Sequence, residues 1–188
     1  DDASSDNSRA VIKKYIKKNK LKKKVKLLYQ EKNMGKGAAI RRGFDEATAP
    51  IVIIQDADKE YTPEDYPIVL EPIISGKADV VYGSRFKGDT TRVLCFWHYV
   101  GNKFFNTFFK YVYKSQFDWH RNLLQGFKGD IVRSMKLESS RFGIEPEMTA
   151  KISKIEDIRI YEVPISYYGR TYTEGKKLVG KMGFRLME

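Results

Sequence analysis

Cysteine, histidine and long apolar runs are scarce in this sequence. Its 188 residues include one cysteine and two histidines. The lone Cys95 excludes an internal disulfide and a cysteine metal cluster, and it is typical of a reducing compartment. His98 and His120 do not have the spacing of a metal-binding pair. No apolar run approaches the roughly 20 residues of a membrane span, and no signal peptide is visible.

Internal repeats and low-complexity linkers are also missing. At 21.8 kDa the chain is long enough to bury a sizeable core. Its content of 41% hydrophobic and 13% aromatic residues excludes a disordered or fibrous protein. We therefore expect one domain over residues 1–188. The sequence begins at Asp1 and not at Met, which is consistent with a fragment.

Positive charge, in contrast, is abundant. The net charge is +11, which fits nucleic acid, an anionic membrane surface or a phosphate-rich substrate as the partner. Much of it lies in KKYIKKNKLKKKVK, from Lys13 to Lys26. We interpret this run as a solvated helix face and the loop after it, because an apolar stripe between Val11 and Ile16 leaves the lysines outward. No recognised nucleic-acid motif accompanies the run, so a nucleic-acid partner is not expected.

Helical and strand-like segments alternate along the chain. Helices are predicted from about Ser8 to Asn19, from Gly35 to about Ala47, from Thr62 to Gly76 and from Glu145 onward. Strands are predicted at Val25–Tyr29, Ile51–Gln55, Ala78–Arg85 and Ile158–Tyr168. Thr62 is a typical cap before Pro63, whereas Pro67 and Pro72 predict a broken or kinked third helix. This order of elements predicts an α/β fold with a parallel sheet.

Acidic residues follow the apolar strand Ile51–Gln55 directly, as Asp56, Asp58 and Glu60. Alternate residues of an extended segment point the same way, so these side chains converge and repel unless a cation lies between them. Oxygen ligands suit a hard divalent ion, Mg²⁺ or Mn²⁺, and such ions commonly bridge to substrate phosphates. The alternative is a polar loop whose acids only cap the helix at Pro63.

The stretch from Arg92 to Lys114, RVLCFWHYVGNKFFNTFFKYVYK, is both aromatic and basic. One interpretation is an amphipathic helical pair that packs on the sheet. The other is a surface that meets lipid, with aromatic side chains on one side and lysines on the other. The two interpretations are compatible.

The stretch IVIIQDADKEYTPEDYP, with VVYGSRF downstream, resembles the family 2 glycosyltransferases of GT-A fold. It is most similar to the dolichol-phosphate mannose synthase-like branch, which moves a sugar from a nucleotide-sugar to a polyprenyl or dolichyl phosphate. The similarity extends to DDASSDNS, NMGKGAAIRRGF, RVLCFWHYVGNK, RFGIEPEMTAKI and EVPISYYGRTYTEGKK. It implies a Rossmann-like domain with a mostly parallel sheet flanked by helices. The branch's first strand and its Pro-x-x-Asn-Glu loop have no counterpart here, so we expect an N-terminally incomplete domain.

The resemblance also implies roles for individual charged side chains. The metal ligands would be Asp56, Asp58 and Glu60, and the nucleotide-binding residues Asp1, Asp2, Lys36 and Asp56. Arg85 and Arg92 would contact the acceptor phosphate, Glu147 would support the sugar pocket, and Asp58 and Arg85 would be the catalytic pair. For Lys36 and Glu147, an ordinary surface or capping role is the alternative.

The implied reaction is an inverting, metal-dependent transfer from a donor of the GDP-mannose or UDP-glucose type, on the cytoplasmic face of a membrane. Arg suits the acceptor phosphate because its guanidinium is planar and always charged. The stretch FDWHRNLLQGFK, from Phe117 to Lys128, departs from the branch's pattern, with Asp118 near the expected acid. The alternatives are therefore a polysaccharide or protein acceptor, and a non-catalytic basic module that binds a membrane or nucleic acid.

Overall fold

The computed structural model describes residues 1–57, 60–84, 124–141 and 143–168. Within these residues four strands form one sheet in the order β1-β3-β2-β4. The strands are β1 (Ile51–Ile54), β2 (Val80–Ser84), β3 (Gln125–Lys128) and β4 (Ile160–Pro164). β3 is antiparallel to both β1 and β2, while β2 and β4 are parallel. Three strands therefore run in one direction, and β3 runs against them between β1 and β2.

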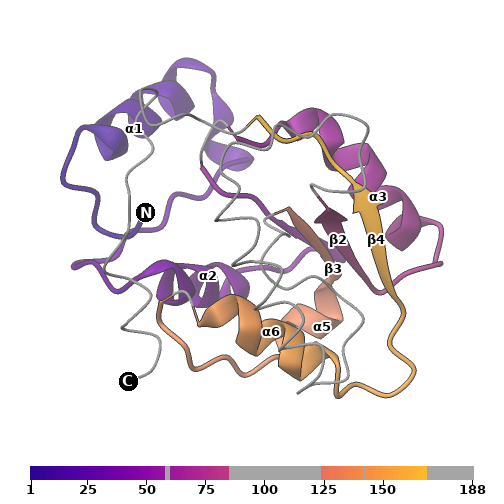
Figure 1. Ribbon diagram of the computed structural model, residues 1–188. Helices are drawn as coiled ribbons and strands as arrows, with labels where there is room; N and C mark the ends of the chain where they lie inside the picture. Colours follow the sequence, from indigo (N-terminus) through magenta and orange to yellow (C-terminus); the bar gives the residue numbers. More distant parts are fainter. Residues whose placement is uncertain (58–59, 85–123, 142, 169–188) are drawn as a thin grey trace.

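Helices cover both faces of the sheet (Figure 1). On one face lie α2 (Lys36–Asp45), α5 (Gly129–Ser134) and α6 (Ile144–Ile152), and on the other lies α3 (Tyr66–Ile74). Successive side chains of a strand point to opposite faces. Tyr82 accordingly packs with Met148 of α6 in one core, and Val81 packs with Val69 of α3 in the other. The predicted α/β architecture with flanking helices is confirmed, with a mixed sheet.

Most of the predicted elements lie where the sequence pattern places them. The first helix is α1 (Ser8–Lys18), and α2 begins directly after Gly35. Thr62 caps the short 3₁₀ helix η2 (Pro63–Asp65), because its hydroxyl accepts a hydrogen bond from the Glu64 amide at 3.3 Å. α3 follows at once and continues through both Pro67 and Pro72, so the helix changes type before the prolines and the break predicted at them is not present.

The predicted strand at Val25–Tyr29 is wrong, since no strand is assigned there. A strand needs a partner along its length, whereas Asp1 makes one bond to this segment and one to Gln30, the residue after it. The amino group of Asp1 donates to the Leu28 carbonyl at 2.8 Å, and the Gln30 amide donates to the Asp1 carbonyl at 2.9 Å. Two bonds to one residue hold the segment in place without forming a ladder.

Two elements, β3 and α5, were not predicted. The sequence of β3, QGFK, contains a glycine and a lysine and one large apolar residue, so it lacks a strand pattern. Phe127 nevertheless is fully buried, and its backbone pairs with Val52 on one side and Val80 on the other. Gly126 points the opposite way, where a Cβ would meet Val69 of α3 at 2.9 Å. The helix therefore approaches the sheet closely at this glycine.

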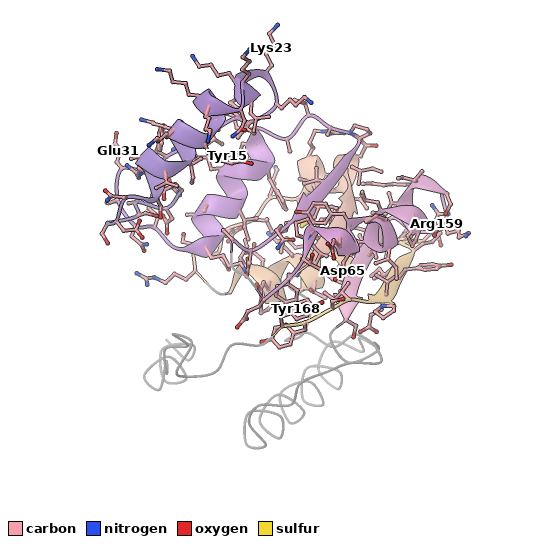
Figure 2. The ribbon with its side chains drawn as sticks, turned by 90° about the horizontal axis from the view of Figure 1, so that it is seen from above. Tyr15, Lys23, Glu31, Asp65, Arg159 and Tyr168 are labelled. Atoms are coloured by element: carbon pink, nitrogen blue, oxygen red, sulfur yellow. The ribbon has the colours of Figure 1, made fainter. Side chains whose placement is uncertain are left out.

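The lysine-rich segment is exposed, as predicted, but its apolar stripe is not buried. α1 has no buried residue, and Val11 and Tyr15 are both 62% exposed. The 3₁₀ helix η1 (Leu21–Lys23) continues the basic surface, and Figure 2 shows Lys23 pointing outward. α1 is tied to the rest through Arg9 and Lys13, which lie over the Tyr29 ring at 5.1 and 4.9 Å from its centroid.

Candidate active site

Three charged side chains meet beyond the carboxyl end of β1. The Lys36 Nζ atom lies 2.9 Å from Asp56 Oδ1 and 3.0 Å from Asp56 Oδ2. It also lies 2.6 Å from Glu145 Oε1. The side chains are partly exposed, at 21% for Lys36, 27% for Asp56 and 20% for Glu145. We call these residues the lysine–acid cluster.

The cluster joins three elements that are far apart in the sequence. Lys36 is the first residue of α2, Asp56 follows β1, and Glu145 lies in the first turn of α6. In open α/β sheets, ligands bind beyond the carboxyl ends of the strands. The cluster occupies such a position, which makes it the leading candidate for an active site within the described residues.

Asp2 fixes the loop that leads to Lys36. Its carboxylate accepts hydrogen bonds from the Met34 amide at 2.8 Å and the Gly35 amide at 2.7 Å. Gly35 has φ +95°, a left-handed conformation that favours glycine. A Cβ at that position would meet the Ser140 carbonyl oxygen at 2.5 Å. The direction in which Lys36 leaves the loop therefore depends on Asp2 and on this glycine.

The 138–141 loop closes the other side of α2, and Glu147 holds that loop. The Glu147 carboxylate accepts hydrogen bonds from the Glu138 and Ser139 amides, each at 2.8 Å, and it pairs with Lys151 at 2.8 Å. Burial alone would raise the pKa of Glu147, but Lys151 and the two amides outweigh it and lower the pKa to about 2. The loop in turn accepts a hydrogen bond from the Ala38 amide at 3.0 Å through the Ser140 carbonyl.

The lysine of the cluster stays charged. Burial alone would lower the pKa of Lys36, but the carboxylates of Glu145 and Asp56 outweigh that effect and raise it. One ammonium and two carboxylates leave the cluster with an excess of one negative charge. The arrangement can hold one cation and still attract a second.

Residues 1–130 match the glycosyl transferase family 2 domain, which is more than half of the chain. The chain belongs to glycosyl transferase family 2. It is 34% identical to glycosyltransferase AglJ of Haloferax volcanii over 140 residues, which cover 72% of this chain and 45% of AglJ. It is 37% identical to the dolichol-phosphate mannosyltransferase of Pyrococcus furiosus over 62 residues, 33% of this chain and 17% of that protein. The chain thus spans less than half the length of these two relatives.

A solved structure shows the same fold as this family 2 chain. Glucosyl-3-phosphoglycerate synthase from Mycobacterium tuberculosis, in complex with UDP, matches with a TM-score of 0.63 at 13% identity, over 96% of this chain and 61% of that chain. Its complex with Mn²⁺, UDP and phosphoglyceric acid matches with a TM-score of 0.59 at 14% identity, over 98% and 62% of the two chains. These likenesses show a GT-A-type fold.

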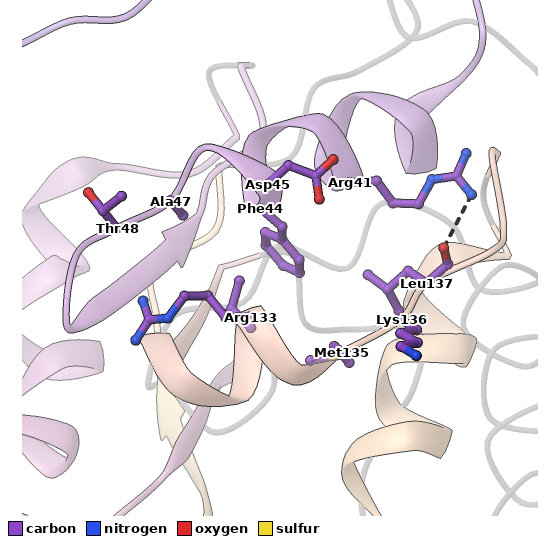
Figure 3. A pocket seen from close by; sticks show the side chains of 10 residues that line it. Arg41, Phe44, Asp45, Ala47, Thr48, Arg133, Met135, Lys136 and Leu137 are labelled. Atoms are coloured by element: carbon purple, nitrogen blue, oxygen red, sulfur yellow. Dashed lines mark hydrogen bonds between the residues drawn. The ribbon is translucent and has the colours of Figure 1, made fainter.

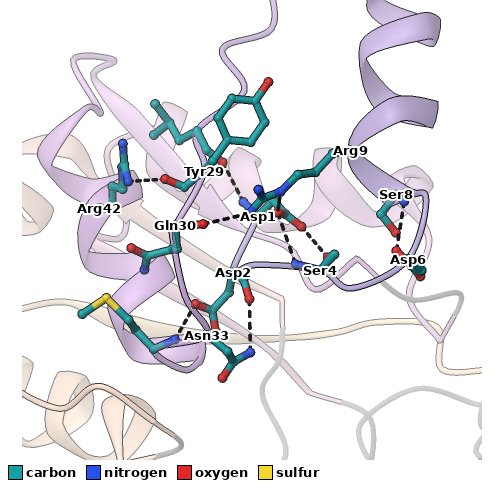
Figure 4. A network of polar contacts seen from close by, with 12 residues as sticks. Asp1, Asp2, Ser4, Asp6, Ser8, Arg9, Tyr29, Gln30, Asn33 and Arg42 are labelled. Carbon is teal, nitrogen blue, oxygen red and sulfur yellow. Dashed lines mark hydrogen bonds and ion pairs between the residues drawn. The ribbon is translucent and has the colours of Figure 1, made fainter.

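Two of the predicted nucleotide residues of this family 2 chain, Asp1 and Asp2, belong to a polar network that reaches the loop before Lys36 (Figure 4). Asp1 forms an ion pair with Arg9, whose guanidinium also donates to the Gln30 carbonyl at 2.7 Å. Asp2 reaches the loop before Lys36, and the Asn33 side chain donates to its carbonyl at 3.1 Å. Both carboxylates therefore bind groups of the protein itself, and contact of Asp1 and Asp2 with a nucleotide stays a prediction.

The predicted metal and acceptor residues are only partly described. Asp58, Arg85, Arg92 and the Arg92–Lys114 stretch lie outside the described residues. Glu60 lies beside the segment after β4, where the Tyr167 hydroxyl donates to its carboxylate at 3.3 Å. No group of three or more His, Cys, Asp or Glu side chains in residues 1–57, 60–84, 124–141 and 143–168 is placed to hold a metal ion. The described helices also include none that is long and apolar enough to cross a membrane.

Glu145 is the site residue that the sequence interpretation missed. The motif Glu145-Pro146-Glu147 predicts a helix start, and the family resemblance implies a role for Glu147 in the sugar pocket. Residues two apart on a helix point in nearly opposite directions, so only one of the two acids faces Lys36. The structure shows that it is Glu145, whereas the Glu147 carboxylate faces the 138–141 loop. A role for Glu147 in a sugar pocket stays a prediction.

A separate cavity of about 660 Å³ lies at the other end of α2 (Figure 3). Its lining includes Arg41, Phe44, Arg133 and Leu137. Arg41 donates to the Leu137 carbonyl at 3.3 Å, and Arg133 forms an ion pair with Asp130. The cavity shares no residue with the lysine–acid cluster, and its two guanidinium groups are already bound to protein acceptors.

Proposed function

We propose that this chain carries the active site of an inverting glycosyltransferase that moves a sugar from a nucleotide-sugar to a polyprenyl or dolichyl phosphate. The observation that carries the proposal is the position of Asp56. It follows β1 at the carboxyl end of the sheet, in an Asp-x-Asp pair, within a chain of family 2. The donor is of the GDP-mannose or UDP-glucose type.

A divalent ion, Mn²⁺ or Mg²⁺, fits the chemistry of Asp56. The Lys36 ammonium lies within 3.0 Å of both carboxylate oxygens, so this position already attracts positive charge. Oxygen ligands are those that such ions prefer. Asp56 and Asp58 would hold the ion, with Glu60 as a third candidate. When bound, the ion neutralises the charge that develops on the leaving diphosphate.

The residues of the chain itself supply fixed charge and position. The Lys36 ammonium lies at the first residue of α2, where the helix dipole adds partial positive charge. It therefore suits a diphosphate oxygen. Asp1 and Asp2 would place the nucleotide through the loops they hold. Glu147 would act through the 138–141 loop, next to the sugar.

Arg85 and Arg92 are the residues that would bind the acceptor phosphate. A phosphate monoester has its second pKa near 6, so a lipid phosphate is largely ionised at neutral pH. It needs a fixed cation to position it more than it needs a base. Direct in-line attack on the anomeric carbon inverts its configuration. The dolichol-phosphate mannosyltransferase relative supports a lipid phosphate, and the Arg92–Lys114 stretch suits a peripheral site on the cytoplasmic face of a membrane.

The test is a panel of nucleotide-sugars with Mn²⁺ and polyprenyl phosphate, with the glycosylated lipid and its anomeric configuration as the readout. We expect one donor to give a lipid-linked sugar of inverted configuration, and omission of the metal to abolish transfer. A water-soluble phosphate monoester, a glycan and a peptide serve as comparison acceptors. Transfer to one of these compounds and not to the lipid would identify that compound as the acceptor in place of the lipid phosphate. No transfer from any donor would refute the proposed glycosyltransferase activity.

A further inference from the structure

The lysine–acid cluster contains one more acid than a simple salt bridge needs. Lys36 lies closer to Glu145, at 2.6 Å, than to either oxygen of Asp56, at 2.9 and 3.0 Å. Glu145 comes from α6, 109 residues along the chain from Lys36. A cation shared between two carboxylates can leave one of them and stay bound to the other.

A divalent ion and Lys36 would compete for the same oxygens. Both Asp56 oxygens are within hydrogen-bonding distance of the ammonium, so an ion that binds Asp56 must weaken or replace those contacts. Two cations side by side repel each other, whereas Glu145 offers the ammonium a second partner. Without Glu145, the ammonium would have Asp56 alone.

We propose that Glu145 is a positioning residue, which retains the Lys36 ammonium when a divalent metal takes Asp56 and keeps it ready for an oxygen of the diphosphate. The inference rests on the proposed function, because it assumes that Asp56 binds the metal. It assigns different roles to the two acids of the site. Asp56 exchanges one cation for another, and Glu145 keeps its partner in both states.

Removal of the Lys36 charge should therefore have opposite effects on two ligands. In Lys36→Met, Mn²⁺ alone should bind about fivefold more tightly, because a competing cation is gone from a partly exposed site. UDP or GDP in the presence of Mn²⁺ should bind at least fivefold more weakly, because the diphosphate loses a cation. The probes are Mn²⁺ paramagnetic resonance and nucleotide calorimetry. Lys36→Gln keeps a hydrogen-bond donor and serves if the Met variant does not fold.

Substitution of Glu145 separates positioning from general electrostatics. In Glu145→Gln, Lys36 should turn fully to Asp56, and Mn²⁺ should bind about fivefold more weakly. In the double variant Lys36→Met with Glu145→Gln, no ammonium remains to be held, so the second substitution should weaken Mn²⁺ binding less than it does when Lys36 is present. Glu156→Gln, an exposed acid beyond α6, is the matched control and should leave Mn²⁺ affinity unchanged.

The outcomes are distinguishable. If Asp56→Asn binds Mn²⁺ like the unchanged protein, Asp56 is not a metal ligand and the proposed function itself fails. If Asp56→Asn loses Mn²⁺ but Lys36→Met does not gain it, the exchange is refuted and the proposed function stands. If Glu145→Gln weakens Mn²⁺ binding equally with and without Lys36, Glu145 acts only through its charge and is not a positioning residue.

Discussion

Two ion clusters lie at opposite ends of the strands of the same sheet, and their net charges have opposite sign. Beyond the carboxyl end of β1, two carboxylates surround the Lys36 ammonium. At the amino ends of β2 and β4, Asp79 is surrounded by two cations. It accepts hydrogen bonds from Arg159 Nε and Nη2 at 2.9 and 2.8 Å, and Lys128 Nζ lies 2.7 Å away. We call Asp79, Arg159 and Lys128 the Asp79 cluster; Figure 2 shows Arg159 at the rim of the molecule.

We interpret this difference as that between a structural clamp and the proposed ligand site. The Asp79 carboxylate is 13% exposed and is bound by both cations and by the Arg159 amide at 2.9 Å, so it has little capacity for another partner. The lysine–acid cluster retains negative charge for a further cation. Ionisable groups with such unbalanced surroundings are found more often at functional sites. Removal of a carboxylate should therefore have different effects on stability and on Mn²⁺ affinity in the two clusters.

The largest contrast is expected for Asp56→Asn. Loss of the carboxylate should lower kcat/KM for sugar transfer about 100-fold or more, because metal and diphosphate charge would no longer be balanced. Stability should change little, since Lys36 keeps Glu145 as its partner. Steady-state kinetics and urea unfolding measure the two effects. A variant that is destabilised yet fully active would place Asp56 among the structural residues.

Asp79→Asn should show the reverse pattern. We expect a loss of about 2 kcal/mol in the free energy of unfolding, because two cations lose their acceptor at a partly hydrated edge of the sheet. Mn²⁺ affinity should not change, because the site lies at the other end of the strands. Urea unfolding and Mn²⁺ titration of the same preparation give both numbers. A change in Mn²⁺ affinity with unchanged stability would contradict a purely structural role for the Asp79 cluster.

The loss of stability at acid pH should come from Glu147 and Asp79, and not from the lysine–acid cluster. The folded-state pKa of Glu147 is lowered to about 2, whereas an unfolded Glu titrates near 4.3. Its contribution is therefore complete above about pH 5 and is lost as pH falls toward 2. Arg159 likewise holds the pKa of Asp79 well below its usual range. The contribution of Asp79 to stability is therefore also lost as pH falls. Glu147→Gln should reduce the acid-induced loss by about 1–2 kcal/mol. An unchanged pH profile would contradict this.

The smallest effect is expected for an isolated surface pair. Lys77 and Glu71 lie 3.2 Å apart, and both side chains are 59% exposed. Lys77→Gln should change the free energy of unfolding by less than about 0.5 kcal/mol, because water and salt screen the pair. It provides the baseline for the two clusters in the same urea assay. A loss as large as that of Asp79→Asn would show that the Asp79 cluster has no special role.

The local parts of the site were predictable from sequence, and the long-range parts were not. Asp56 follows from an apolar strand that ends in an acid, whereas the role expected for Lys36 comes from the family resemblance of its glycine-rich loop. Glu145 was missed because no local pattern reveals which face of α6 meets α2, 109 residues earlier. The sugar-pocket role that the family resemblance implies for Glu147 stays a prediction, and its carboxylate binds the amide of Glu138, nine residues before it.

The fold shows the same limit. A helix such as α2 is indicated by the glycine before it and by its own apolar spacing, and it lies where expected. Strands depend on their partners: Val25–Tyr29 has the composition of a strand but is paired with no other strand, whereas QGFK has a poor composition and lies inside the sheet between β1 and β2. β-propensity measures fit to a sheet environment, so the sequence of one segment cannot supply it.

The central place of β3 has a consequence for synthesis of the protein. β1 and β2 do not pair with each other; each pairs with β3, which follows them in the chain. A nascent chain that has emerged as far as Ser84 therefore holds two strands that are not neighbours in the finished sheet. At ribosomal rates the wait for β3 is roughly 2–9 s. During it the edges of β1 and β2 stay open to pairing with other chains. Expression yield should thus increase with chaperone supply.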